Sequence, residues 1–242
     1  MHAALADDHG EEDFTPQPLT RLYLRSLYQS LRNSARRSLQ MLRKHRRRLP
    51  EAEAERARSL LEREAELMER LAAVRTGTLD GARTRCHGDY HLGQVLWTGR
   101  DFVIIDFEGE PARPLSERRL KWTPLRDVAG MIRSFQYAAW TGLHRQITRG
   151  SIADSAEARA AWAPAAAAWE QWAAAAFLGT YLDTLRERRA DLLPAANDDV
   201  RRLLDAWLLE KALYEVRYEL DNRPDWIGIP LHGVLEILDT TA

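Results

Sequence analysis

Apolar residues recur at spacings of three and four over most of this chain, and this periodicity constrains its fold more than any other feature. The periodic segments cover about residues 19–49, 51–74, 155–190 and 198–221, with a further one starting at residue 123. Such spacing places apolar side chains on one face of an α-helix. Only the segment between Ala82 and Asp106 departs clearly from it in favour of short strands. The sequence therefore predicts an α+β fold that is predominantly helical.

The non-helical segment has the pattern of a β-hairpin. Residues 94–97 and 102–105 are short, largely apolar runs, and the four residues 98–101 between them include Gly99. Two such runs around a glycine-containing turn are typical of antiparallel strands. These strands flank the part of the chain that is densest in glycine, histidine and aspartate, so we expect the functional residues there.

Prolines mark the expected boundaries of the helices. Residues 1–18 are acidic and contain Pro16 and Pro18, which predicts an extended lead-in or tail. Pro124 follows Thr123, an arrangement typical of a helix start. Pro164 predicts a break within the helix over residues 155–190. The four tryptophans of the middle region are predicted to pack between helices: Trp140, Trp162, Trp169 and Trp172.

Composition excludes several classes of function. The chain has 35 Lys+Arg and 36 Asp+Glu, and 35 − 36 leaves a net charge of −1, which argues against a nucleic-acid-binding protein. No apolar stretch approaches the length needed to cross a bilayer, and the acidic N-terminal residues do not form a signal peptide. The single cysteine, Cys86, cannot form an internal disulfide and fits a reducing compartment. We expect a cytoplasmic protein that binds neither nucleic acid nor membrane.

Two carboxylates and an amide are placed beside the strands of the predicted hairpin. Asp89 precedes the first strand, Gln94 begins it, and Asp106 follows the second. Because the strands lie side by side, these groups would converge on one pocket, and such oxygen donors suit Mg²⁺. Phosphoryl transfer needs a similar set of groups. Cys86, His87 and His91 could instead bind zinc, but they lack a convincing fourth ligand.

The spacing of these residues resembles a known family. His-Gly-Asp, four residues, an amide and then Ile-Asp-Phe resemble the catalytic and metal loops of aminoglycoside-phosphotransferase-like kinases, whose fold is related to protein kinases. The fuller wording is similar to maltokinases over residues 87–94, 105–111, 113–119, 124–131 and 218–226. The resemblance implies a protein-kinase-like C-terminal lobe over residues 19–242, with a small hairpin that carries both loops.

The resemblance also implies roles for individual residues. Asp89 would be the catalytic base at the acceptor hydroxyl, and His87 would either orient the catalytic loop or take part in proton transfer. Gln94 and Asp106 would bind Mg²⁺, and Glu108 would contact the metal directly or through water. Supporting roles near the catalytic loop are expected for Asp127 and Arg126. ATP is the implied co-substrate.

A polar and aromatic face of the helix over residues 198–221 is a candidate sugar site. Lys211, Glu215, Tyr218 and Asn222 follow one another at i, i+4, i+7 and i+11 and therefore share a face. This face is either a solvated stripe or, together with Trp226, a wall that binds a disaccharide. His91 either faces the sugar or fills the catalytic loop.

The sequence leaves three functions open. The first is a maltokinase lobe that phosphorylates the anomeric hydroxyl of maltose to give maltose 1-phosphate, with a possible fusion to or association with a trehalose synthase. The second is another small-molecule hydroxyl kinase, and the third is a non-catalytic lobe that binds a partner. The glycine-rich loop and strand lysine of an N-terminal nucleotide lobe are not recognisable, so we expect the chain alone to be inactive.

Overall fold

A computed structural model describes residues 1–7, 10–77, 79–111 and 113–240. Its α-helices are α1 (His2–Leu5), α2 (Arg21–His45), α3 (Glu51–Glu62), α4 (Glu64–Ala72), α5 (Leu115–Arg118), α6 (Leu125–Thr148), α7 (Ala156–Arg189), α8 (Asn197–Asn222) and α9 (Gly228–Asp239). The strands are β1 (Gln17–Pro18), β2 (Ala82–Arg83), β3 (Val95–Trp97) and β4 (Phe102–Ile104). Short 3-10 helices cover Glu12–Phe14, Arg46–Arg48, Ala73–Arg75, Leu92–Gln94, Ala190–Leu192 and Pro224–Trp226. The predicted helix-dominated α+β class is confirmed.

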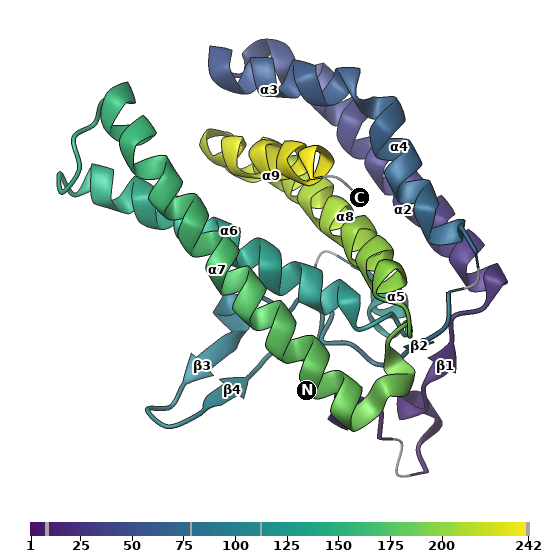
Figure 1. Ribbon diagram of the computed structural model, residues 1–242. Coiled ribbons are helices and arrows are strands. Elements are labelled where there is room, and N and C mark those ends of the chain that lie inside the picture. The colour runs from purple at the N-terminus through teal and green to yellow at the C-terminus, as the bar shows by residue number, and fades with distance from the viewer. Residues whose placement is uncertain (8–9, 78, 112, 241–242) are drawn as a thin grey trace.

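Helix α8 forms the centre of the molecule. Figure 1 shows α2, α3 and α4 on one side of α8 and α6 and α7 on the other, while α9 packs along α8. Half of the residues of α8 are buried, and Leu203, Leu209 and Leu213 are at most 1% exposed. Burial of such a leucine side chain stabilises the fold by roughly 1.5–3 kcal/mol. The core therefore lies around α8, which also fixes the position of every polar group that this helix carries.

The hairpin β3–β4 projects from the helices (Figure 1) and matches the predicted strands to within one residue. Its antiparallel register pairs Val95 with Ile104 and Trp97 with Phe102. Gly99 in the turn has φ of 93°, a conformation that glycine adopts without steric cost. The aromatic side chains at the tip are mostly exposed, so the hairpin is held by its ladder and turn rather than by the helical core.

The N-terminal segment differs from the predicted free lead-in. Helix α1 packs against α7, and His2 and Ala6 are only 1% and 3% exposed. Further along, β1 pairs with β2 through Pro18 and Ala82. Acidic composition predicts solvation of the segment as a whole, but it does not reveal that a few side chains in it have buried partners elsewhere in the chain.

Two expectations for the long helix α7 are wrong. The helix continues through Pro164, which removes one backbone hydrogen-bond donor and leaves the rest of the helix intact. Trp162 and Trp172 are more than half exposed, because α7 packs through only part of its surface, whereas half-exposed Trp169 does pack edge-on against Phe135 of α6, with centroids 6.4 Å apart. None of the described helices is long and apolar enough to cross a membrane.

Candidate active site

The first turn of α6 holds the loop that carries Asp89. The Asp127 carboxylate accepts hydrogen bonds from the backbone N–H of His87 through Oδ2, at 2.6 Å, and of Gly88 through Oδ1, at 3.0 Å. Gly88 has φ of 87°, which turns the loop so that both N–H groups point towards α6. Asp127 is 2% exposed, and burial tends to raise its pKa, but hydrogen bonds and nearby positive charge outweigh burial and lower the pKa. The carboxylate therefore stays ionised and fixes the residue next to Asp89.

One helical turn further along α6, Gly130 lets the same loop approach the helix. A Cβ atom at this position would lie 2.7 Å from the backbone oxygen of Tyr90, which is closer than real Cβ contacts occur. The loop is held from the same helix at Leu92, whose N–H donates to the Ser134 hydroxyl at 3.1 Å. Helix α6 therefore determines both the position and the closeness of the Asp89 loop.

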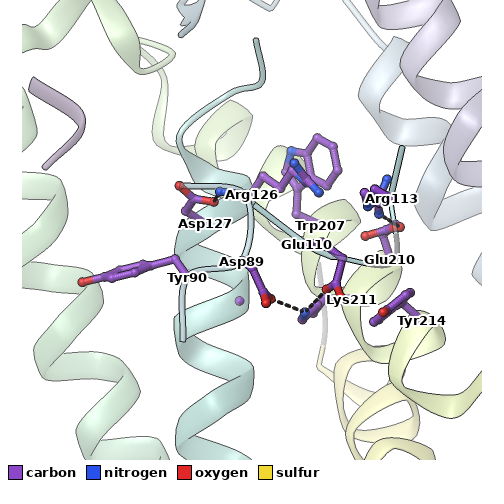
Figure 2. A pocket seen from close by; sticks show the side chains of 12 residues that line it. Asp89, Tyr90, Glu110, Arg113, Arg126, Asp127, Trp207, Glu210, Lys211 and Tyr214 are labelled. Carbon is purple, nitrogen blue, oxygen red and sulfur yellow. Dashed lines mark hydrogen bonds and ion pairs between the residues drawn. The ribbon is translucent and has the colours of Figure 1, made fainter. Parts of the chain in front are cut away.

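Asp89 is paired with a lysine from the central helix. Lys211 Nζ lies 3.5 Å from Asp89 Oδ1 and 3.7 Å from Glu110 Oε2, and Figure 2 shows both carboxylates pointing towards the ammonium group. His91 Nε2 lies 3.7 Å from the other Asp89 oxygen. Burial would raise the pKa of Asp89, but His91 and Lys211 together lower it to about 2. Asp89 is therefore an ionised carboxylate at neutral pH.

The second loop brings Gln94 and Asp106 into contact. The Gln94 amide donates to Asp106 Oδ2 at 2.9 Å. Asp106 has φ of 64°, the only positive φ at a non-glycine residue among the described residues. Residues other than glycine seldom adopt this conformation, although aspartate tolerates it better than most. Glu108 is exposed nearby in sequence. The amide oxygen of Gln94 and the exposed carboxylate of Asp106 form a donor set that suits Mg²⁺.

His87 joins the two loops. Its ring is 1% exposed and its Nε2 lies 2.7 Å from the backbone oxygen of Ile105, the residue before Asp106. The ring also packs against Phe107, with centroids 4.8 Å apart. These contacts place the His87 ring between the two loops, and its orienting role stays a prediction.

A cavity of about 390 Å³ opens in front of Asp89, within the size range of small-molecule sites. Its wall includes His91, Lys211 and Tyr218, together with Glu215. The Glu215 carboxylate is already engaged, because buried Arg133 donates to it from Nε and Nη2 at 2.9 and 2.7 Å. His91, Glu215 and Tyr218 therefore border the cavity as expected, with Glu215 held in a buried ion pair.

Asn222 and Trp226 lie away from this cavity, contrary to the predicted sugar wall. Asn222 donates to the backbone oxygen of Tyr218 in its own helix, and Trp226 lines a separate cavity of about 700 Å³ with Trp140 and His144. The helical periodicity correctly predicted that Asn222 shares a face with Lys211, but it does not show how far apart the two residues lie along the helix. Eleven residues at 1.5 Å each separate Asn222 from Lys211 by about 16 Å along the helix axis.

Several residues of the site were not among the predicted ones. Lys211 was placed on the correct face but not assigned to the site, although it is one of only three lysines in the chain. Glu110 and Tyr214 also border the cavity, without a sequence signal that distinguished them. Arg126, predicted to support the catalytic loop, stacks over the rings of Trp122 and Trp207 behind that loop, at 5.0 and 5.8 Å.

The sequence of this chain is similar to a known family and to known proteins. Residues 1–109 match the APH family, described as a phosphotransferase enzyme family. The chain is 29% identical over 191 residues to a glucosamine kinase of Streptacidiphilus jiangxiensis, which covers 78% of this chain and 39% of that protein. It is 33% identical over 157 residues to a glucosamine kinase of Mycolicibacterium smegmatis (strain ATCC 700084 / mc(2)155), which covers 63% of this chain and 34% of that protein.

Solved structures agree over nearly the whole chain. A glucosamine kinase in complex with glucosamine, ADP and inorganic phosphate superposes with a TM-score of 0.73 at 25% identity, over 98% of this chain and 48% of that one. A second crystal form of a glucosamine kinase gives a TM-score of 0.72, over 98% and 50%. The fold is kinase-like. The kinase-like chain spans between about a third and a half of the length of these relatives.

The comparisons support the phosphotransferase part of the sequence resemblance and its kinase-like fold. They do not support its narrower part, because these relatives are named glucosamine kinases rather than maltokinases. The identity of the acceptor therefore has to be argued from the cavity.

Proposed function

We propose that this chain is the acceptor-binding and metal-binding lobe of an ATP-dependent kinase that phosphorylates a hydroxyl group of a sugar. The observation that carries the proposal is the ionised Asp89 carboxylate at the wall of a sugar-sized cavity, next to the loop of Gln94 and Asp106. Phosphoryl transfer relies on positioning and electrostatic stabilisation, and this chain offers both.

Each residue has a distinct task in this proposal. Asp89 orients the acceptor hydroxyl and accepts its proton. Gln94 and Asp106 would hold Mg²⁺, with Glu108 as a further oxygen donor. When bound, Mg²⁺ neutralises charge on the phosphates of ATP. Asp127 and His87 keep the two loops at their mutual distance through the hydrogen bonds described above.

An amino sugar such as glucosamine is the acceptor that we propose first. Around the reacting carboxylate, Asp89 and Glu110 face one ammonium group, that of Lys211. Two carboxylates and one cation leave an excess negative charge, which favours a cationic acceptor. Glu215 and Glu219 do not alter this balance, because Arg133 and Arg223 pair with them. The names of the relatives support the same acceptor.

Maltose is the second candidate, and an aromatic feature of the cavity favours it. Tyr214 and Tyr218 stack with centroids 6.5 Å apart and both border the cavity, which offers a longer apolar wall than a single ring. A disaccharide presents more of its CH surface to such a wall than a monosaccharide does. An association with a trehalose synthase is part of the proposal only for this acceptor.

Calorimetric titration of the chain with glucosamine, maltose and glucose tests the proposal. We expect saturable binding of glucosamine that Asp89→Asn weakens at least about tenfold, because the carboxylate contacts the acceptor. Asp221→Asn, on an exposed position of α8, should leave the affinity unchanged. Tighter binding of maltose than of glucosamine would favour the second candidate. Absence of any sugar binding would contradict the proposal and favour the non-catalytic, partner-binding lobe.

A further inference from the structure

A buried histidine near the start of the chain contacts the residue that holds the catalytic loop. His2 Nε2 lies 3.0 Å from Asp127 Oδ2, and the Tyr181 hydroxyl lies 2.8 Å from His2 Nδ1. The Tyr181 ring also packs edge-on against the imidazole, with centroids 5.7 Å apart. His2 thus bridges α7 and α6, although 125 residues separate it from Asp127 in sequence.

The direction of the hydrogen bond follows from the state of Asp127. Burial would raise the pKa of Asp127, but the hydrogen bond with His2, the nearby Arg126 and the Gly88 N–H lower it, so the carboxylate is ionised and can only accept. His2 Nε2–H therefore donates. Oδ2 receives this bond together with the one from the His87 N–H, and Oδ1 receives the Gly88 N–H. Three donors from two segments fix one carboxylate.

We infer that His2 is a positioning residue for Asp89. Its ring locks the Asp127 carboxylate in the orientation in which both oxygens accept from the catalytic loop, and Tyr181 locks the ring in turn. The consequence for the loop follows from the contacts alone, and the consequence for catalysis rests on the proposed function. Without His2, Asp127 retains its two loop bonds but can rotate, and Asp89 loses its fixed position relative to Asp106.

A metal site is the competing explanation of the same cluster. Donor atoms of His2, Cys86 and Asp127 all lie within 4.8 Å of one another. A structural zinc site takes four ligands, whereas the described residues place three donor side chains here. The Asp127 oxygens are moreover occupied by N–H donors. The hydrogen-bonded arrangement therefore accounts for His2 and Asp127 without an ion, and the Cys86 thiol has a backbone partner of its own in the Trp122 oxygen at 3.4 Å.

Hydrogen–deuterium exchange of the 242-residue chain tests the inference without any assay of activity. In His2→Ala, we expect the amides of His87 and Gly88 to exchange roughly tenfold faster than in the wild type, because their acceptor is no longer fixed. His2→Gln should restore protection, since its terminal amide reaches the place of Nε2, whereas the shorter His2→Asn should not. Tyr181→Phe should give an intermediate loss.

Leu67→Ala is the matched control, because Leu67 is fully buried in α4 and distant in the fold from this cluster. It should lower global stability while the protection of residues 87 and 88, relative to the core, stays as in the wild type. Unchanged exchange at these amides in His2→Ala, or no difference between the Gln and Asn variants, would overturn the inference. Stoichiometric Zn²⁺ binding that is lost in His2→Ala would also overturn it.

Where the proposed function holds, turnover provides a second readout, measured in whichever polypeptide carries this chain in the cell. His2→Ala should lower kcat roughly tenfold to a hundredfold, while KM for the sugar rises less than the about tenfold loss of affinity expected for Asp89→Asn, since Asp89 is misplaced rather than removed. The Gln variant should recover most of kcat. A rise in KM with kcat unchanged would overturn the inference. Wild-type ADP release that does not depend on added sugar would contradict only the proposed function.

Discussion

Lys211 Nζ lies 3.5 Å from Asp89 Oδ1, so the proposed catalytic carboxylate is paired with a cation that the core helix α8 provides. Glu110 approaches the same ammonium group from the metal-loop side at 3.7 Å. The charge of the acceptor cavity is thus determined by a residue whose backbone is immobilised in the most buried element of the fold. A substitution at Lys211 can change this charge without moving either loop.

Lys211→Met should shift the preference of the cavity towards cationic acceptors. Removal of the ammonium group leaves Asp89 and Glu110 without their shared counter-ion, so the affinity for glucosamine relative to glucose should rise by roughly tenfold, or about 1.4 kcal/mol. Calorimetry with both sugars measures this ratio. Lys121→Met, whose ammonium group contacts only backbone oxygens of Glu12 and Thr15 in the described structure, is the control. An unchanged ratio would remove Lys211 from the acceptor site.

Asp106→Asn should separate turnover from sugar binding. In whichever polypeptide carries this chain in the cell, loss of the carboxylate should reduce sugar-dependent ADP release at least about a hundredfold, because the metal no longer has its charged ligand. Chelation of the metal should give the same loss in the wild type. The sugar affinity should stay within about twofold, and Asp101→Asn in the hairpin turn should be nearly neutral. Weakened sugar binding with normal turnover would contradict the assignment.

The 242 residues alone should show negligible kinase activity. His87 joins the loop that carries Asp89 to the loop that carries Asp106, but a glycine-rich phosphate loop and a strand lysine are not recognisable in this sequence. Positioning is the main source of rate in phosphoryl transfer. A coupled assay of ADP release with MgATP and each sugar checks this expectation. Robust sugar-dependent turnover by the purified chain would show that residues within it also bind the nucleotide.

Glu170 should make the fold less stable as the pH rises towards neutrality. Burial, with repulsion from Glu236, raises the pKa of Glu170 from 4.5 to about 7. Between these two values the unfolded chain has released a proton that the folded chain retains, so the free energy of unfolding falls with increasing pH. Glu170→Gln should remove this fall. Urea denaturation at pH 5 and pH 8 measures the change in the free energy of unfolding between the two pH values. Exposed Glu187→Gln is the control, and the same change in the wild type and in both variants would refute the prediction.

Loss of one member of the buried pair of Arg133 and Glu215 should destabilise the fold strongly, whereas replacement of both by apolar residues should destabilise it little. Arg133→Met leaves a buried carboxylate without its partner and should lower the free energy of unfolding by roughly 3–5 kcal/mol. The double variant Arg133→Met/Glu215→Met should recover most of this loss. Arg58→Met, in an exposed pair with Glu55, should cost less than about 1 kcal/mol. A double variant as unstable as the single one would show that other contacts of Arg133 dominate.

Local signals predicted the elements well. The hairpin was placed to within a residue because its strands and glycine turn lie within a dozen consecutive residues. The helix over residues 198–221 was also placed closely, although a local rule wrongly broke α7 at Pro164. Pro164 shows that a proline can lie inside a long helix, so the local rule alone does not place a helix end.

The site was only partly predictable, because its decisive contacts join distant segments. Asp89 and Asp106 were found from their spacing to the strands, but the pairing of Asp89 with Lys211 spans 122 residues and that of His2 with Asp127 spans 125. Helical periodicity states in which direction a side chain points, not how far along the axis it lies. Glu215 was therefore placed at the cavity correctly, whereas Asn222, on the same face of the helix, lies away from it.

The contacts of Asp127 and Gly130 with the Asp89 loop suggest which residues to compare in related sequences. Gly130 lies three residues after Asp127. Asp127 accepts hydrogen bonds from the Asp89 loop, and Gly130, one turn later in α6, leaves room for the backbone of the same loop. A side chain at position 130 would clash with the Tyr90 backbone oxygen, so the loop or the helix would have to shift. Relatives that keep an aspartate and a glycine at this spacing can retain the loop against the helix. Relatives that replace the glycine must pack the loop and the helix differently at this point, whatever their overall likeness to this chain.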